Sequence, residues 1–411
     1  MYGNQKDIKY NLKLFFIDGI LFTPTLTLIS IATVIPFFLE RLGASTFQIG
    51  IAASLGLVCT LITQPFFGSF ASRPQILSKT FGKILLIQRV IFLMFVLSIP
   101  FLSDNSALLI WMFLVFWGIF NLFVGSYGVF YPILVLKLLP PDKRGVARGL
   151  GNAVGCILGV GATALIPVIL LRFSHPYDFM IIFLAGTVFL LIDAVVFLLL
   201  RDCGESDPPE HMGVAKYIKG MPKTLRDNQA FRVLILTCTL LIAANSLLPY
   251  YTVYAIRIFH ASEASIATFA AIAVIANAVG FVIFGPVIDR RGPIYTAAIS
   301  ACLVLLAGVL ALVTNSLLLL YIAWAIANLG STAYYSSMSL MMGEIDTSDK
   351  MPLFMGVYNT ISMAFSAIVL LVLAPVLENV GFTMLFVTAI SCGGISFLVN
   401  VFVLRKLLKK K

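Results

Sequence analysis

The stretch Gly-Pro-Val-Ile-Asp-Arg-Arg-Gly-Pro occupies residues 285–293 and separates two long apolar runs. Its three charged residues, Asp289, Arg290 and Arg291, lie in a turn that is too short to form a domain. Two long apolar helices that are joined by so short a turn must run antiparallel. Because charge is costly inside a bilayer, we expect the turn to lie at a membrane surface.

The composition of the whole chain agrees with that reading. Of the 411 residues, 60% are hydrophobic and 11% are charged, and the mean hydropathy is +1.02. A soluble protein of this size could not cover its surface with so few charges. A membrane-spanning helix needs about 20 apolar residues. The apolar runs predict an all-α integral membrane protein with twelve helices, at 14–38, 48–72, 84–102, 108–136, 146–171, 179–200, 230–254, 264–288, 294–313, 316–342, 352–376 and 382–404.

The distribution of positive charge predicts the orientation of the chain. Of the 28 Lys and Arg, 24 lie on the side that holds both termini, three (Arg41, Arg172 and Arg257) lie on the opposite side, and Arg89 lies within a predicted helix. This asymmetry predicts a multi-pass protein of the cytoplasmic (inner) membrane with both termini in the cytoplasm. The net charge of +10 is thereby explained without nucleic acid. The six cysteines show no paired spacing, so we expect neither disulfides nor a metal site.

Internal repetition divides the chain into two halves. With a shift of 217 residues, Gly68 falls on Gly285 and Arg73 falls on Arg290, without a gap from 43 to 73. With a shift of 207 residues, the segment 118–152 aligns without a gap, and Asn121 falls on Asn328. These predict two pseudo-symmetric six-helix bundles, at 1–200 and 230–411, joined by a cytoplasmic linker at 201–229. Two parallel repeats are typical of carriers that rock about a central site.

These features resemble the major facilitator superfamily over nearly the whole chain. The signature turn of that family, Gly-x-x-x-Asp-Arg-x-Gly, is matched by Gly285, Asp289, Arg290 and Gly292, and Arg291 fills its variable position. The first copy keeps Gly68 and Arg73 but has Ser72 in place of the acid. The resemblance implies that the acid of the turn lies against a helix N-terminus of the opposite half. Asp289 is then expected to face the start of the helix at 146–171, with Arg144 or Arg148 as candidate partners, and to hold the cytoplasmic side closed.

Asp18, Arg89 and Asp193 are the three ionisable side chains that lie clearly inside predicted helices. A charge at membrane depth is a functional candidate by default. Asp18 is about five residues into its helix, or about 7 Å from the cytoplasmic end, where it could exchange a proton between states. A structural pair, for example with Arg89, is the alternative. We take Asp18 and Arg89 as ion-coupling candidates and expect packing or snorkelling for Arg89 and Asp193, because their helices are usually peripheral in the family.

Uncharged polar and aromatic residues mark the expected central cavity. Such side chains supply hydrogen bonds and aromatic walls without charge, although buried Asn and Tyr also bond helices to each other. They suit a neutral or amphipathic organic solute rather than a highly charged one. The candidates are Asn121, Tyr127, Tyr131, Asn245, Tyr250, Asn277, Asn328, Tyr334, Tyr335 and Asn359.

A glycine series in the helix at 146–171 places Gly151, Gly155 and Gly159 four residues apart. This spacing allows close helix approach, and we expect the series to pack against the other half. It resembles the glycine-rich motif of the superfamily's antiporters only faintly, since Val160 replaces the proline.

The sequence predicts a secondary transporter that works by alternating access. We favour a monomer that exports a neutral or amphipathic small organic solute in exchange for protons. An importer or facilitator of a small neutral nutrient, and a receptor or assembly protein that has lost transport, are the alternatives. Because no phosphate-binding Gly-rich loop with Lys and Ser or Thr is present, we expect no enzymatic use of ATP and no cofactor.

Overall fold

The structure is a computed structural model that describes residues 4–71, 76–202, 225–226, 228–345 and 351–404. The side chains of residues 141–150 and of Asp289 are also outside the described set. The described chain consists of helices joined by short connections, with no strand among the described residues. It packs as two compact units, in which Met1–Ala44 and Val58–Val214 form unit 1, and Ser45–Leu57 and Ala215–Lys411 form unit 2.

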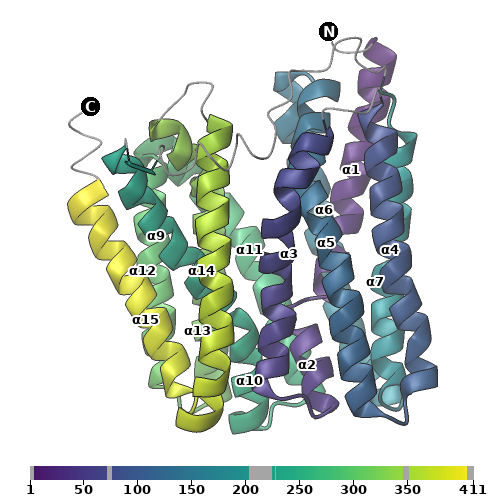
Figure 1. Ribbon diagram of the computed structural model, residues 1–411, viewed down its shortest axis with the longest axis vertical. Coiled ribbons are helices and arrows are strands. Elements are labelled where there is room, and N and C mark those ends of the chain that lie inside the picture. Colours follow the sequence, from purple (N-terminus) through teal and green to yellow (C-terminus); the bar gives the residue numbers. More distant parts are fainter. Residues whose placement is uncertain (1–3, 72–75, 203–224, 227, 346–350, 405–411) are drawn as a thin grey trace. The chain divides into compact units, whose positions relative to one another are not determined.

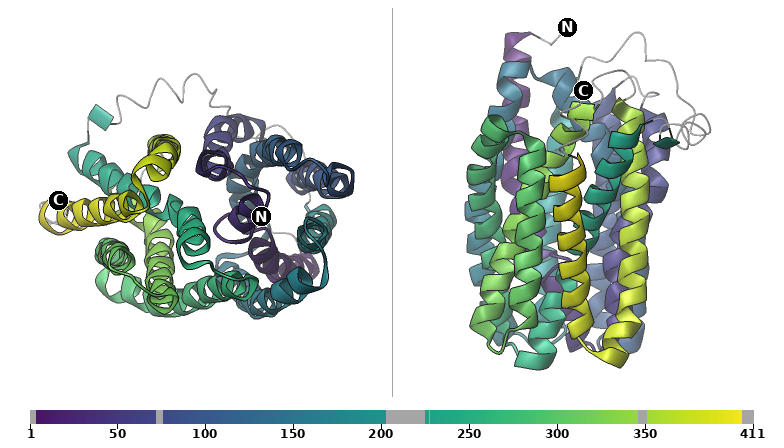
Figure 2. Two further views of the ribbon diagram at one scale, coloured as in Figure 1. Left: turned by 90° about the horizontal axis from the view of Figure 1, so that it is seen from below. Right: turned by 90° about the vertical axis from the view of Figure 1, so that its left-hand side faces the viewer.

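Each unit is a bundle of helices that run alongside one another (Figures 1 and 2). Unit 1 contains α1 (Gln5–Leu28), α2 (Val34–Arg41), α4 (Leu77–Leu102), α5 (Ser106–Leu138), α6 (Pro141–Arg172) and α7 (Tyr177–Leu199). Unit 2 contains α9 (Gln229–Ser246), α10 (Leu248–Phe259), α11 (Glu263–Arg291), α12 (Pro293–Leu312), α13 (Leu317–Ile345), α14 (Met351–Val380), α15 (Thr383–Leu398) and the π-helix η1 (Val399–Leu404). The helix α3 (Thr46–Ala71) begins in unit 2 and continues in unit 1.

Eleven helical segments among the described residues are long and apolar enough to cross a membrane. They match the second to the twelfth predicted helices. The first predicted helix is formed by α1 and α2 and is not among the eleven, because it is interrupted and its first half carries charged residues. The predicted all-α membrane fold is thus confirmed. The predicted linker at 201–229 lies largely outside the described residues.

Two of the predicted continuous helices are broken. The helix predicted at 14–38 ends at Leu28 and resumes at Val34, and the helix predicted at 230–254 ends at Ser246 and resumes at Leu248. Proline explains both breaks, because Pro36 and Pro249 have no N–H to donate to the carbonyl four residues earlier. Each proline lies in the first turn of the second piece, where a missing donor is tolerated.

The two units differ in how their cores are filled. In unit 1, aromatic rings from four helices meet: Phe81 stacks on Phe130 at 5.4 Å between ring centroids and contacts Phe197 edge-on at 4.9 Å. In unit 2, the core includes small side chains such as Ala297 and Ala301 of α12. Small residues let helices approach closely, which replaces the hydrophobic driving force that a bilayer does not supply.

The start of α3 is fixed within unit 2 by polar contacts. The backbone N–H of Thr46 donates to Glu378 Oε1 of α14 at 2.7 Å, and Arg257 Nη1 of α10 donates to Thr46 Oγ1 at 2.9 Å. A carboxylate at a helix N-terminus is favourable because it satisfies a free N–H and complements the helix dipole.

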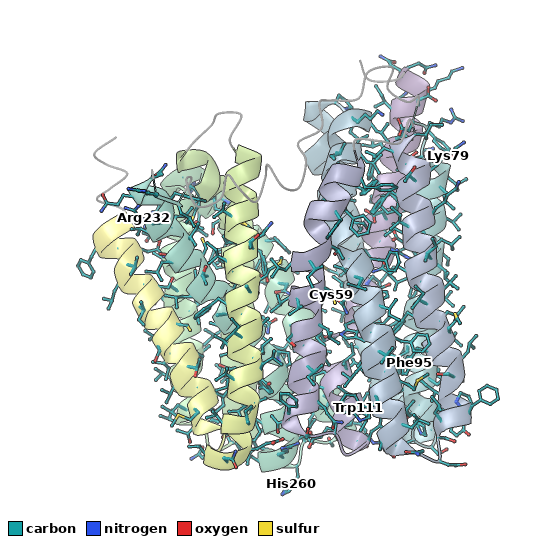
Figure 3. All side chains as sticks on the ribbon, viewed as in Figure 1. Cys59, Lys79, Phe95, Trp111, Arg232 and His260 are labelled. Carbon is teal, nitrogen blue, oxygen red and sulfur yellow. The ribbon has the colours of Figure 1, made fainter. Side chains whose placement is uncertain are left out.

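In each unit, two of the side chains labelled in Figure 3 lie at opposite ends of the bundle. In unit 1, Lys79 lies near one end and Trp111 toward the other, and in unit 2 Arg232 and His260 are separated in the same way (Figure 3). This agrees with the alternation of loops that the charge distribution predicts within each half.

Candidate functional site

A line of three buried polar side chains on α1 faces α7. Asn11, Asp18 and Thr25 are spaced seven residues apart, so they share one face of the helix. Asn11 exchanges two hydrogen bonds with the backbone of Arg201, at 3.0 and 2.9 Å, and Thr25 Oγ1 donates to the Gly186 carbonyl at 3.5 Å. Asp18 therefore lies in the middle of an α1–α7 contact that is bonded on both sides.

Asp18 lies deeper in its helix than predicted. The helix α1 begins at Gln5, where the Asn4 side chain caps it, and Asp18 follows thirteen residues later, or about 20 Å along the axis. The predicted value of about 7 Å was wrong, because the charged segment before residue 14 was not expected to be helical. The side chain is 2% exposed, and its Oδ1 accepts a hydrogen bond from the Tyr127 hydroxyl at 3.4 Å.

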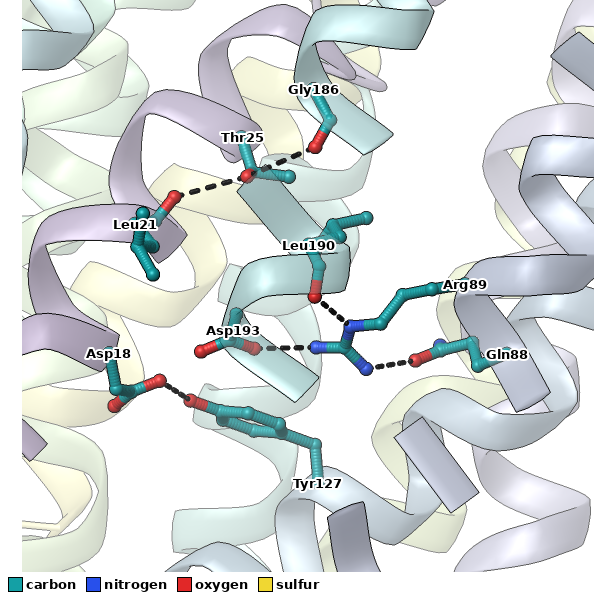
Figure 4. Close-up of polar contacts among 9 residues, drawn as sticks. All are labelled: Asp18, Leu21, Thr25, Gln88, Arg89, Tyr127, Gly186, Leu190 and Asp193. Carbon is teal, nitrogen blue, oxygen red and sulfur yellow. Dashed lines mark hydrogen bonds and ion pairs between the residues drawn. The ribbon is translucent and has the colours of Figure 1, made fainter. Parts of the chain in front are cut away.

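Arg89 and Asp193 form a buried ion pair on the far side of the same cluster (Figure 4). Arg89 Nη2 donates to Asp193 Oδ2 at 2.6 Å, Nε donates to the Leu190 carbonyl at 2.7 Å, and Nη1 donates to Gln88 Oε1 at 3.1 Å. The Arg89 side chain is 2% exposed and that of Asp193 is fully buried. Of the two expected roles, packing agrees with this burial and snorkelling does not, because the guanidinium finds three acceptors inside unit 1.

The cluster contains one more acid than base. Asp193 Oδ2 is paired with Arg89, but its Oδ1 is buried and has no protein donor among the described residues. In Figure 4 this carboxyl group points toward that of Asp18, and the two groups are close enough to interact electrostatically. Two carboxyl groups can share a hydrogen bond only if one carries a proton. One bound proton therefore makes the whole cluster neutral.

Aromatic rings cover the Asp18 side of the cluster. Tyr127 stacks between Phe22 of α1 and Tyr131 of α5, with centroid distances of 5.3 and 4.9 Å. Tyr127 is half-buried and Tyr131 is buried. These rings shield the carboxyl group from water, while the Tyr127 hydroxyl gives it a hydrogen-bond donor.

The glycine series of α6 packs against α1, next to Asp18. A Cβ on Gly19 would lie 2.7 Å from the Gly151 carbonyl carbon, and a Cβ on Gly155 would lie 2.8 Å from Thr23 Oγ1. The predicted close approach is present, but its described partner lies in the same unit rather than in the other half. The pattern of small residues indicates a contact without naming the partner.

Three of the candidate asparagines already bond to protein groups. Asn121 donates to the Trp117 carbonyl at 2.7 Å, and its repeat twin Asn328 donates to the Trp324 carbonyl at 2.9 Å. Asn277 accepts a hydrogen bond from Thr332 at 2.8 Å, which joins α11 to α13. The pairs 117/121 and 324/328 are related by the same shift of 207 residues. These amides stabilise each unit, and a role in solute binding stays a prediction.

The remaining cavity candidates differ in how free they are. Tyr250 is fully buried and donates to the Leu370 carbonyl at 3.1 Å, and buried Tyr334 contacts the Tyr358 hydroxyl through its own hydroxyl. Tyr335 is 54% exposed. Asn245 lies at the break between α9 and α10, and its buried Nδ2 has no partner among the described residues. Asn359 on α14 is half-buried. Tyr335, Asn245 and Asn359 thus stay candidates for solute binding, whereas the Tyr127 hydroxyl is already bonded to Asp18.

The charged turn at 285–293 is even tighter than its sequence suggests. Gly292 alone separates α11 from α12 and has a φ of 84°, a conformation that favours glycine. Arg291 donates to the Tyr295 hydroxyl at 2.7 Å, and Arg290 is exposed. Gly285 lies within α11 and Gly68 within α3. Arg73, Ser72 and the side chains of Asp289, Arg144 and Arg148 lie outside the described residues, so the latch stays a prediction.

Comparison with solved structures shows that other proteins share this fold. The nucleoside transporter NupG (D323A mutant) superposes with a TM-score of 0.71 at 14% identity, covering 97% of this chain and 99% of that one. A POT family transporter in complex with a thioalcohol-conjugated peptide superposes with a TM-score of 0.68 at 12% identity, covering 98% and 96%. At these identities the likeness shows the fold alone. No curated protein sequence matches significantly.

The sequence itself matches a family model. The model for the Major Facilitator Superfamily matches residues 158–370 and 233–411 in two overlapping alignments, which together cover more than half of the chain. Its members are membrane transporters, and the eleven apolar helical segments fit that environment. The chain therefore belongs to the Major Facilitator Superfamily and is a multi-pass membrane transporter.

Proposed function

We propose that the protein is a proton-coupled secondary carrier that exports a neutral or amphipathic small organic solute by alternating access. The observation that carries the coupling is the buried cluster of Asp18, Asp193 and Arg89. It holds two acids and one base whose side chains are all buried inside unit 1. A single proton removes its excess charge, and a group that gains and loses a proton can link solute movement to a proton gradient.

The interactions of the buried charged groups bear on the chemistry of the solute. The three ionisable side chains inside the predicted helices interact within the cluster, where Arg89 donates to Asp193 and Tyr127 donates to Asp18. The polar groups that remain as candidates for a solute are those of the uncharged Tyr335, Asn245 and Asn359. A fixed anion such as a phosphate ester would need an Arg or Lys clamp. We therefore infer an uncharged or amphipathic solute.

The orientation of the chain is part of the same proposal. The excess of Lys and Arg on the side of both termini supports a cytoplasmic position for them in the inner membrane. To test the orientation, a single cysteine is placed at either terminus of the protein, and intact cells are treated with a thiol reagent that does not cross membranes. Labelling of that cysteine without permeabilisation would show that the termini face the outside.

The function is tested with purified full-length protein. A thermal-shift screen against a library of small organic solutes identifies ligands, and the ligands are then followed in proteoliposomes with an imposed pH gradient. The proposal expects saturable flux against the solute gradient that a protonophore abolishes. Flux that ignores the pH gradient would indicate a facilitator, and binding without flux would indicate a receptor.

A further inference from the structure

We propose that Asp193 shares the coupling proton with Asp18, and that Arg89 positions Asp193 and limits the pair to one proton. This inference rests on the proposed proton coupling and deepens it. The sequence predicted packing or snorkelling for Asp193. In the structure Asp193 lies between Asp18 and Arg89, and each of its two oxygens has a different environment (Figure 4).

The Arg89 guanidinium is held in one orientation by three acceptors. It donates to the Leu190 carbonyl and to Asp193, which lie about one turn apart on α7, and to Gln88 on its own helix. Gln88 in turn donates to the Phe120 carbonyl of α5 at 3.0 Å. With Asp193 in place, the positive charge therefore stays beside Asp193 and neutralises one carboxylate only. A fixed guanidinium of this kind keeps the other Asp193 oxygen directed at Asp18.

The surroundings of Asp18 supply no second positive charge from the described residues. From α7 it meets Asp193, from α5 the hydroxyls of Tyr127 and Tyr131, and from α4 the more distant Arg89. From α6, Gly151 and Gly155 lie against α1 next to Asp18 and carry no titratable group, and the side chains of Arg144 and Arg148 lie outside the described residues. No described residue supplies the charge that would balance the second carboxylate, and a proton is a cation that fits between two carboxyl groups.

Charge counting then gives the number of protons that makes the cluster neutral in each variant. The wild-type cluster, with two acids and one base, is neutral with one proton. Asp18→Asn and Asp193→Asn each leave one acid and Arg89, which are neutral with none. Arg89→Gln leaves two acids, which need two protons, and the double variant Arg89→Gln/Asp193→Asn leaves one acid, which needs one. The double variant therefore restores the wild-type proton number.

The test is infrared titration of full-length protein in detergent, with the proton as the probe. The carbonyl band of protonated carboxyl groups is followed above about pH 6, where exposed Asp and Glu are ionised because their ordinary pKa is about 4. Relative to wild type, the band should be lost in both Asn variants, about doubled in Arg89→Gln and restored in the double variant. Arg89→Lys keeps the positive charge and should show the wild-type band. If the Arg89→Gln protein does not fold, Arg89→Lys is measured in its place.

The outcomes separate this inference from the proposed function. If Asp193→Asn keeps the wild-type band while Asp18→Asn loses it, Asp18 binds the proton alone and the inference is wrong, whereas proton coupling stands. If no band in wild type depends on Asp18, both fall. If the double variant does not recover the wild-type carbonyl band, Arg89 does not set the number of protons and that part of the inference is wrong.

Discussion

The close contact between α1 and α6 leads to a quantitative prediction for Gly19→Ala. The new Cβ would lie 2.7 Å from the Gly151 carbonyl carbon, 2.8 Å from the Asn152 nitrogen and 2.9 Å from the Gly151 Cα. All three are backbone atoms, which cannot rotate away as a side chain can. Ordinary contact distances begin at 3.4 Å. The two helices must therefore separate by roughly 1 Å, and overpacking of this kind costs about 1–3 kcal/mol.

The matched control is Gly161→Ala on α6. A Cβ there would meet nothing within 4 Å, and Ala in a helix is more favourable than Gly by up to about 1 kcal/mol. The assay is thermal unfolding of purified protein in detergent. Gly19→Ala should lower the unfolding temperature by several degrees, whereas Gly161→Ala should leave it unchanged or raise it. Equal unfolding temperatures for the two variants would refute the close helix contact beside Asp18.

Three further variants test other parts of the structure. Gly292→Ala places a side chain at a φ of 84° and should cost about 1–3 kcal/mol of stability, measured by the same thermal assay; no loss would show that the turn between α11 and α12 is not strained. Glu378→Gln removes the carboxylate at the start of α3 and should cost about 0.3–1 kcal/mol, less at high salt; a loss that ignores salt would argue against a charge effect. Asp289→Asn should favour the inward-open state, read as faster labelling of cytoplasm-facing cysteines. Unchanged labelling would argue against the latch.

Helix positions could be predicted from the sequence because apolar length is a strong signal. The turn at residues 285–293 predicted two antiparallel helices, and the structure joins α11 to α12 through Gly292 alone. The breaks at Pro36 and Pro249 were missed because the apolar runs continue across them. Pro36 and Pro249 each remove a backbone donor from a predicted helix, but Pro24 and Pro100 lie inside continuous helices, so proline alone does not locate a break.

The cluster around Asp18 could be predicted only in part. Three ionisable residues inside apolar helices must find partners, and two acids with one base indicate an excess of one carboxylate. Which helices bring them together does not follow from composition. The seven-residue spacing of Asn11, Asp18 and Thr25 is the signal that was overlooked, because it places three polar groups on one face of α1. It indicates a polar contact along the helix, although not that α7 provides the other side.

The central claim is that the proton bound near Asp18 drives transport. The most direct measurement compares Asp18→Asn with wild type in proteoliposomes that contain a solute from the screen. We expect the variant to exchange solute between the two sides at equilibrium but to lose accumulation driven by an imposed pH gradient. Accumulation by Asp18→Asn at the wild-type level, with the same sensitivity to a protonophore, would contradict the account.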